Sequence, residues 1–406
     1  MKRMGVFPAA VGTAAVMAML TGCASPESPA PGDPVGPAAS APQTSLPPIV
    51  SPAQLDAGRY PTVPRPPLGR AGDPKTGAVV DAQRLADHVV GPWEAHRELI
   101  SPYLSTFYLL DTPTTLSQFS PDSVAQRAQS HGFVNGFASA REAPDKHILI
   151  NAVMRFPDPA AAQAAATDMN SATAEQAVRG ATPVPATIPG HPETLAFTYP
   201  FTPTGSDKPW AVIRSFTPHG PFVFMQLAQS VDGLDMAATL VQKVVDLQAP
   251  RVDKFSPADP NALGEVELDP TGLLAKTIPA ESNPSSTKNA VYDERGAMHF
   301  QTNPLESKTL FSDTGVTTVA MAAASVYQAR NPGSALMIVN AFSKEILNQG
   351  AAVDAVPNLP ESHCATRGKS FYCVALAGEY AVEVNGDALP DVHQRTAAQY
   401  ILLTAG

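Results

Sequence analysis

One pattern occurs twice in this chain, as ILINAVMRFPDPAAAQAAATDM (residues 148–169) and as AASVYQARNPGSALMIVNAF (residues 323–342). In each copy a strand-like segment is followed by a helix that opens at an Asx-Pro pair, Asp158-Pro159 or Asn331-Pro332. An Asp or Asn side chain accepts hydrogen bonds from free N–H groups of the first turn, and proline fits the first helical position. Each copy therefore predicts a strand and a capped helix.

The order of elements after each copy is also the same. A similar Pro-containing loop, a hairpin and a closing helix follow in both halves, and the first hairpin is predicted to turn through residues 217–221. The matched segments are IPGHPE (188–193) and VPNLPE (356–361), the hairpins at 211–229 and 371–384, and the closing helices at about 234–247 and 392–403. The match predicts an internal duplication and an α+β fold of two related domains, each an antiparallel sheet packed with helices. Chance similarity between common α+β patterns is the alternative.

The length of 406 residues is too great for one ordinary domain and fits two domains with additional segments. Proline-rich stretches and the two copies of the pattern set the expected boundaries. These are a signal peptide (1–22), a disordered Pro-rich tether (23–54), a first domain that begins with an extended strap (55–249), a crossover linker (250–288) and a second domain (289–406). In the crossover, Val266-Glu267-Leu268 is a candidate edge strand, and Gly91-Pro92 divides the helical pattern of residues 82–110 into two short helices.

The N-terminus has the pattern of a bacterial lipoprotein signal. Lys2 and Arg3 precede an apolar run that is too short to span a bilayer, and the run ends in Leu20-Thr21-Gly22-Cys23. This tetrapeptide resembles the lipobox, in which the cysteine is lipidated and becomes the first residue of the mature chain. We therefore expect lipid on Cys23 and attachment to the outer face of the cell membrane, because two or more acyl chains anchor stably. An ordinary cleaved signal with an incidental cysteine is the alternative.

The tether and the strap differ in composition. Residues 24–54 are rich in Pro, Ala, Gly and Ser, so they bury too little apolar surface to fold and predict an extended spacer. A Pro-rich ligand for a partner domain is the alternative. The segment LDAGRYPTVPRPPLG (55–69) contains leucine, tyrosine and two arginines, which a pure spacer does not need. We expect it to pack as a strap on the folded body.

The sequence contains three cysteines. If Cys23 carries lipid, Cys364 and Cys373 are left, on either side of a predicted hairpin turn. An exported protein meets an oxidising compartment, so the pair predicts a structural disulfide rather than a metal site. Two free or redox-active thiols are the alternative.

The lipobox, the spacer, the strap LDAGRYP (55–61) and the duplicated body together resemble a family of actinobacterial lipoproteins, common in mycobacteria, that carry a domain of unknown function (DUF7373 type). The resemblance covers nearly the whole chain and implies a cell-envelope protein with no assigned reaction and no catalytic residues to carry over. A fainter resemblance to the extracellular sensor domain of a mycobacterial serine/threonine kinase supports the fold class at most.

The sequence contains none of the common catalytic or cofactor motifs. It lacks G-x-S-x-G, H-E-x-x-H, a phosphate-binding Gly loop and a calcium loop. His88 and His96 share a helical face only if Gly91-Pro92 does not break the register, His219 is expected in a solvated turn, and His363 lies beside a cysteine already assigned to the bridge. We therefore predict no catalytic residue, no metal and no cofactor, although catalytic groups dispersed along the chain leave no local motif.

The net charge and the aromatic residues indicate which classes of partner to expect. A net charge of −10 argues against nucleic-acid binding. Trp210, Phe216, Phe222 and Phe224 are either core residues or the lining of an apolar cleft between domains for a lipid, a glycolipid or a peptide.

The sequence thus predicts a non-enzymatic envelope lipoprotein that binds or senses a lipid, a glycolipid or an envelope protein. An envelope hydrolase with dispersed catalytic residues and a structural envelope protein without a ligand are the alternatives.

Overall fold

A computed structural model describes residues 50–175, 180–202, 207–281 and 286–404. The predicted signal peptide, Cys23 and the tether up to residue 49 lie outside these residues. The last part of the predicted tether is described, and it includes a short 3₁₀ helix, η1 (Pro52–Gln54). None of the described helices is long and apolar enough to cross a membrane.

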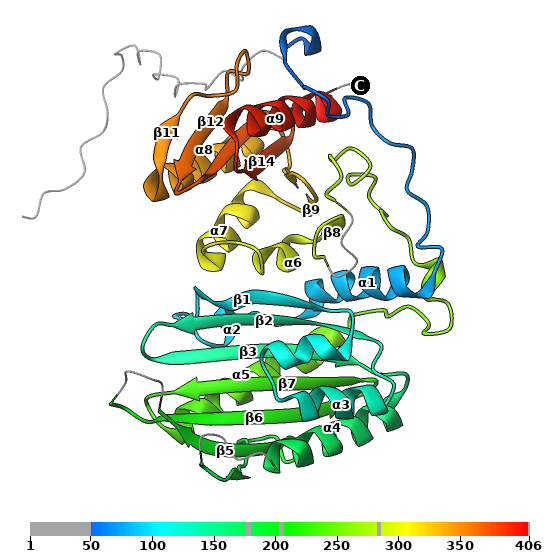
Figure 1. Ribbon diagram of the computed structural model, residues 1–406, viewed down its shortest axis with the longest axis vertical. Helices are drawn as coiled ribbons and strands as arrows, with labels where there is room; N and C mark the ends of the chain where they lie inside the picture. The colour runs from blue at the N-terminus through cyan, green and yellow to red at the C-terminus, as the bar shows by residue number, and fades with distance from the viewer. Residues whose placement is uncertain (1–49, 176–179, 203–206, 282–285, 405–406) are drawn as a thin grey trace, which may run out of the picture. The chain divides into compact units, whose positions relative to one another are not determined.

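The first domain is built on a seven-stranded sheet with the order β1-β2-β3-β7-β6-β5-β4, and every pairing in it is antiparallel (Figure 1). Its strands are β1 (Ser101–Leu110), β2 (Asn135–Ala143), β3 (His147–Arg155), β4 (Val184–Pro185), β5 (Leu195–Phe201), β6 (Trp210–His219) and β7 (Phe222–Ser230). The edge strand β1 is irregular, with a register shift between Pro102 and Phe107. Leu104 and Thr106 have positive φ values of 49° and 68° there, a conformation that disfavours regular edge pairing.

The second domain has a seven-stranded sheet in the order β11-β12-β13-β14-β10-β9-β8, again antiparallel throughout. Its strands are β8 (Ala290–Tyr292), β9 (Thr318–Met321), β10 (Ser325–Gln328), β11 (Ala351–Val353), β12 (Ser362–Arg367), β13 (Ser370–Ala377) and β14 (Tyr380–Gly386). Read from the opposite edge, this order matches the first sheet strand for strand. The predicted α+β fold of two related antiparallel domains is therefore confirmed.

The helices correspond in the same way. The first domain contains α3 (Asp122–Ser130), α4 (Pro159–Ala174) and α5 (Leu234–Val252), and the second contains α6 (Glu294–Met298), α7 (Pro304–Thr314), α8 (Pro332–Gln349) and α9 (Leu389–Thr404). Two further helices, α1 (Pro74–Leu85) and α2 (Pro92–Ala95), precede β1. The helices α4 and α8 each follow the third strand of their sheet, and α5 and α9 each follow its last strand.

Both predicted helix caps form. The Asp158 side chain accepts a hydrogen bond from the backbone N–H of Ala161 at 2.8 Å, and Asn331 accepts one from Ser334 at 2.9 Å. Each cap is followed by proline at the first helical position. The first turn of each helix is therefore satisfied by the same two residue types in both domains.

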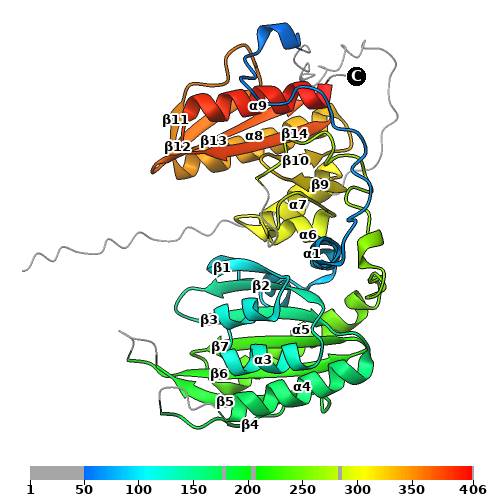
Figure 2. The ribbon, with the colours of Figure 1, turned by 45° about the vertical axis from the view of Figure 1, so that its right-hand side comes forward.

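Each sheet is covered by helices on both faces (Figure 2). In the first domain α3 and α4 pack on one face and α5 on the other. In the second domain α8 packs on one face and α9 on the other. The largest apolar cluster contains Phe137 and Phe224 from the first sheet together with Phe311 and Tyr327 from the second domain. The two domains therefore share part of one core.

The strap packs on the second domain, although it precedes the first domain in the chain. Leu55 and Ala57 pack against the cluster beneath α9. Tyr60 donates a hydrogen bond to Asp391 of α9, and Gln394 of the same helix donates to Asp56 at 2.9 Å. Sequence alone placed the strap at the start of the first domain, because long-range contacts leave no mark on local pattern.

Three local predictions are corrected by the structure. The strand β6 continues to His219, and the turn of its hairpin is only Gly220-Pro221, because Gly220 adopts a φ of 53°. The segment at 266–268 forms one isolated bridge, between Glu267 and Arg70, rather than an edge strand. In the stretch predicted to be helical, 82–110, the break at Gly91-Pro92 is confirmed because α2 begins at Pro92, but residues 101–110 form the strand β1 rather than a helix.

A candidate ligand-binding groove along helix α1

Helix α1 is fixed at its N-terminus by local sequence. Asp73 accepts hydrogen bonds from the backbone N–H groups of Lys75 and Thr76, and Pro74 takes the first helical position. The backbone carbonyl of Leu263 lies so close to Gly77 that a Cβ there would come within 1.9 Å of its oxygen. Glycine is therefore needed for the crossover to pack on this helix.

A buried ion pair joins α1 to the first sheet. Asp81 on α1 and Arg155 on β3 lie 2.6 Å apart, and both side chains are almost fully buried. Asn135 donates to Asp81 at 3.1 Å, and the backbone N–H of Ala258 in the crossover donates at 3.0 Å. The carboxylate thus has several donors, as a buried charge requires. Helix, sheet and crossover are held in one arrangement.

A second buried cation joins the domains near the same place. Arg141 on β2 donates to the backbone carbonyls of Ile100, His299 and Gln301 at 2.8–3.0 Å. Its guanidinium lies over the ring of Trp93, and burial lowers the pKa of Arg141 to about 10. No carboxylate pairs with Arg141 in the part of the chain that the structure describes. It therefore links β2 to the segment after α6 through carbonyl dipoles.

The first cavity beside α1 has both charged and apolar side chains in its lining and a volume of about 410 Å³. It lies between the end of α1, the crossover and the strands β8 and β9. We call it the polar pocket; its lining includes Arg84, Asp87, His88, Lys254, Glu267 and Asp293. His88 and Arg84 both lie against the ring of Phe255, with centroid distances of 5.1 and 5.5 Å.

Two carboxyl groups meet in the polar pocket. Asp293 caps α6 by accepting hydrogen bonds from the N–H groups of Arg295 and Gly296 at 2.7 and 2.9 Å, and its own N–H donates to Asp87 at 3.1 Å. Burial, and then the nearby charge of Asp293, raises the pKa of Asp87 well above its usual range. Asp87 therefore retains its proton to higher pH than an ordinary aspartate.

The second cavity beside α1 has a volume of about 430 Å³ and a different lining. It is formed by the strap, α1 and the crossover, and it has an apolar floor with basic residues at its rim. We call it the basic pocket; it is lined by Arg65, Leu68, Lys75, Thr76, Val79, Val80, Gln83, Leu268, Leu274, Pro279, Ser286, Lys288 and Asn289.

The two pockets share Val80, Gln83 and Leu268. They are thus neighbouring parts of one depression, which we call the α1 groove. Both volumes fall within the range of small-molecule sites, about 300–1,000 Å³. Residues from the strap, the first domain, the crossover and the second domain all contribute to the groove. The apolar cleft predicted from the sequence is a different one, lined by four aromatic residues. The residues of the α1 groove are far apart in the chain and carry no shared motif.

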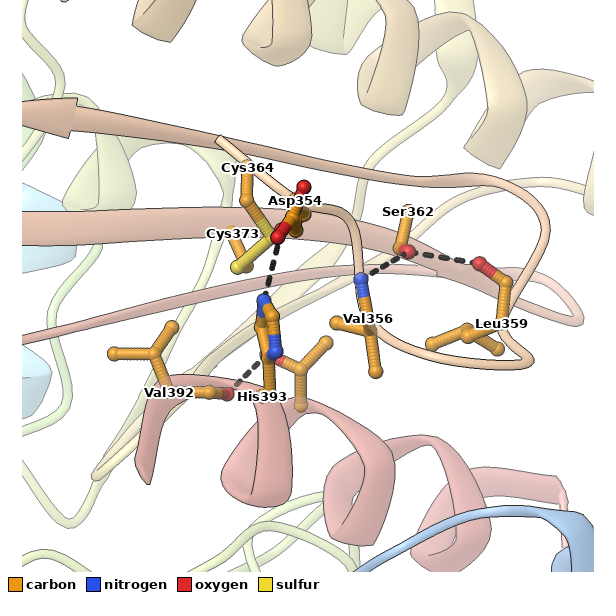
Figure 3. Close-up of a disulfide and its surroundings, with 9 residues drawn as sticks. Asp354, Val356, Leu359, Ser362, Cys364, Cys373, Val392 and His393 are labelled. Atoms are coloured by element: carbon orange, nitrogen blue, oxygen red, sulfur yellow. Dashed lines mark hydrogen bonds between the residues drawn. A yellow bond between two sulfur atoms is a disulfide. The ribbon is translucent and has the colours of Figure 1, made fainter. Parts of the chain in front are cut away.

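The predicted disulfide is present. Cys364 on β12 and Cys373 on β13 lie directly opposite each other and are bonded (Figure 3). His393 of α9 lies beside the bridge and is held by the backbone carbonyl of Asp354 at 2.9 Å. The two sulfurs and the His393 ring are close enough to resemble a metal-binding set. The sulfurs are already bonded to each other, so the cluster offers no thiolate ligand.

The four aromatic residues predicted for an apolar cleft are buried. Phe222 and Phe224 belong to the core shared by the domains, whereas Phe216 packs in the cluster under α3 and α4. Trp210 is on β6, an even number of residues from Phe216 and hence on the same face. The four are divided between opposite faces of the sheet, and none of them lines either pocket of the α1 groove.

The histidines singled out in the sequence lie apart. His88 is in the polar pocket, whereas His96 packs edge-on against His147 at 5.2 Å. His219 pairs with Asp253 at 2.7 Å. The most enzyme-like contact is made by His147, which lies 3.1 Å from Ser230 and 3.6 Å from Asp232. Ser230 is fully buried and its oxygen accepts the N–H of Asp232, so the serine is not presented to a substrate.

The fold and the groove define a two-domain α+β protein with a cavity where the domains meet. Residues 68–268 match the N-terminal part, and residues 273–406 the C-terminal part, of the family described as domain of unknown function DUF7373. The chain belongs to this family. Among curated proteins the comparison finds no match.

Among solved structures, the crystal structure of the extracellular domain of PknH from Mycobacterium tuberculosis is similar at 17% identity. The similarity covers 41% of this chain and 94% of that chain, with a TM-score of 0.28.

Proposed function

We propose that this protein is an exported lipoprotein, anchored to the outer face of the cell membrane through lipid on Cys23, that binds a ligand in the α1 groove without catalysing a reaction. The anchor is supported by the basic start, the apolar run and the Leu20–Cys23 tetrapeptide. Export is also supported by the Cys364–Cys373 disulfide, since such bonds persist in oxidising compartments.

The binding role rests on one observation, the α1 groove. It combines two cavities of about 410 and 430 Å³ at the meeting place of strap, crossover and both domains. Ligand sites are commonly concave and located at domain interfaces. The residues around it are fixed by the Asp81–Arg155 ion pair, so the groove is largely preformed.

The anchor is tested by replacing Cys23 with serine. We expect Cys23→Ser to release the protein from the membrane fraction or to stop its processing, because the acyl chains supply the membrane affinity. A variant that remains in the membrane fraction at the wild-type level contradicts the anchor.

Binding is tested by filling the groove. Val80 lines both pockets, so Val80→Trp is expected to occlude them, whereas Leu247→Trp, at an exposed position on α5, is a matched control. Small molecules extracted from each purified protein are compared by mass spectrometry. We expect a compound that accompanies the wild type and the control but not Val80→Trp. If the wild type carries no compound, and no fraction of an envelope extract raises its Tm, the protein has a structural role instead.

A further inference from the structure

The basic pocket has an unusual charge for this chain. The whole sequence has 37 acidic and 27 basic residues. The lining of the basic pocket nevertheless contains Arg65, Lys75 and Lys288 and no acidic residue. Lys75 and Lys288 are exposed and form no salt bridge within the described ranges. A local excess of positive charge in an acidic protein favours an anionic ligand at this place.

Arg65 is partly buried and forms no salt bridge among the described residues, although the charge of Asp269 acts on its guanidinium. It donates from Nη2 to the backbone carbonyls of Leu274 and Thr277 at 2.6 and 3.3 Å. Its Nε atom is buried and has no hydrogen-bond partner, and burial lowers the pKa of its guanidinium. A buried donor without a partner costs free energy. A negative charge close to this guanidinium would therefore be stabilised.

The polar groups on the pocket wall are mostly used within the protein. Gln83 donates to the backbone carbonyls of Ser286 and Lys288 at 2.9 and 3.3 Å. Asn289 exchanges hydrogen bonds with Ala280, and the Thr76 hydroxyl donates to Asp73 at 2.6 Å. What remains for a ligand is the basic rim and the apolar floor, which is formed by Leu68, Val79, Val80, Leu268 and Leu274, while Pro279 is exposed.

We propose that the basic pocket binds a single-chain amphiphile with an anionic head, whose head contacts Lys75, Lys288 and Arg65 and whose alkyl chain covers the apolar floor. The assignment rests on the proposed ligand-binding function of the α1 groove and specifies the ligand class. The continuity of the floor with the polar pocket through Val80 and Leu268 gives the chain room to extend along α1.

The test uses dodecyl phosphate below its micelle concentration as the probe. The protein is the chain from residue 23 to its end, produced with Cys23→Ser and without the signal peptide, so that it carries no acyl groups that compete, and binding is followed by calorimetry. Dodecyl maltoside has the same alkyl chain with an uncharged head, and inorganic phosphate is the head alone. We expect dodecyl phosphate to bind at least tenfold more tightly than either, with an affinity that decreases as salt is added.

Variants then assign the binding to this pocket. Lys75→Gln combined with Lys288→Gln is expected to weaken dodecyl phosphate binding at least tenfold, while Lys344→Gln, at an exposed position on α8, leaves it unchanged. Both lysines of the double variant are exposed, so an unchanged Tm confirms that the fold is intact. Val80→Trp should abolish binding of the probe.

Four outcomes overturn the proposal. Equal affinity for dodecyl maltoside shows that the head is not recognised, and equal affinity for inorganic phosphate shows a simple anion site. Binding to phosphatidylglycerol vesicles without binding to monomeric probe shows attraction to a charged membrane surface. If the probe fails but Val80→Trp still loses its co-purified compound, the ligand class is wrong and the binding function stands.

Discussion

The first sheet buries a hydrogen-bonded set of polar side chains, whereas the second sheet links the two strands of its β12–β13 hairpin by a disulfide. In the first domain Asn151 donates to Gln248 at 3.0 Å and accepts from Gln226 at 3.0 Å, and Ser215 donates to Gln226 at 2.9 Å. In the second domain apolar residues under α9 surround the disulfide, and the buried Gln399 of α9 bonds to the backbone of the crossover rather than to side chains of the sheet.

The strand order is nevertheless the same in both domains. What the domains share is local, namely an Asx-Pro helix start and a hairpin whose two-residue turn begins with glycine at positive φ, Gly220 or Gly378. We infer that turn and cap residues specify the topology, while different core chemistry stabilises it in each domain.

The largest loss of stability is expected when the Asp81–Arg155 ion pair of the first domain is broken. Asp81→Ala leaves Arg155 buried without its partner, and breaking such a pair costs about 3–5 kcal/mol. Urea unfolding measures the free energy. The matched control is Asp313→Ala, at an exposed position on α7, which we expect to change stability by less than about 0.5 kcal/mol. A small loss in Asp81→Ala would show that the pair does not hold α1 in place.

The next largest effect is a pH dependence of the free energy of unfolding, which arises at the contact between the domains. His299 is buried, its Nδ1 accepts from Ser139 at 2.9 Å and its Nε2 donates to the carbonyl of Ala86 at 3.2 Å. Burial lowers the pKa of His299 from 6.5 to about 4. The unfolded chain therefore binds the proton first, and stability present above about pH 6.5 is lost as the pH falls towards 4, by up to about 3 kcal/mol.

Unfolding curves between pH 4 and pH 7 measure this dependence. We expect His299→Gln to be less stable at pH 7 but to have a flatter slope over the same range, because the titrating group is gone. Parallel slopes for the wild type and His299→Gln would assign the pH dependence to other groups.

A third prediction concerns the contribution of the disulfide to the stability of the second domain. The bridge joins residues separated by 9 positions, and closing a loop of about ten residues stabilises by about 2.5 kcal/mol in the chain-entropy estimate. Replacing Cys364 and Cys373 together by alanine should lower the free energy of unfolding by about that amount. Reduction of the wild type should give the same loss, and reduction should not affect the double variant. Loss of the fold of both domains in the double variant would show that the bridge does more than close a loop.

The smallest effects are expected at the two helix caps, and they should be alike. Asp158→Ala and Asn331→Ala each remove one side-chain hydrogen bond to the first turn, at a cost of about 1 kcal/mol. Thermal unfolding of the two variants and of Asp158→Asn compares the positions directly. If removal of one cap does not change the thermal stability, the two caps are not equivalent. The shared Asx-Pro pattern then contributes less to specifying the topology.

The sequence predicted the features that depend on neighbouring residues. Asp158-Pro159 and Asn331-Pro332 indicated both helix starts, and the spacing of Cys364 and Cys373 indicated the bridge. The strand β6 was predicted too short because Pro218 and Gly220 lie close together, although proline there is accommodated in the strand.

The groove could not be predicted in the same way. Arg65, Lys75 and Lys288 meet at the basic pocket although more than two hundred residues separate the first from the last. Asp87 and Asp293 are also separated by more than two hundred residues along the chain, and neither lies in a recognisable motif. Only the packing of the strap and crossover against α1 brings these groups together, and packing of this kind has no period or spacing in the sequence.

The central claim is that the α1 groove is occupied in the native protein. The most direct measurement is an experimental structure of the protein purified from its own cells without added ligand. We expect density for a small molecule in contact with Val80 and Leu268, with a charged group near Lys75 and Lys288. A groove that contains only water, in protein never exposed to detergents that compete for the site, would contradict it.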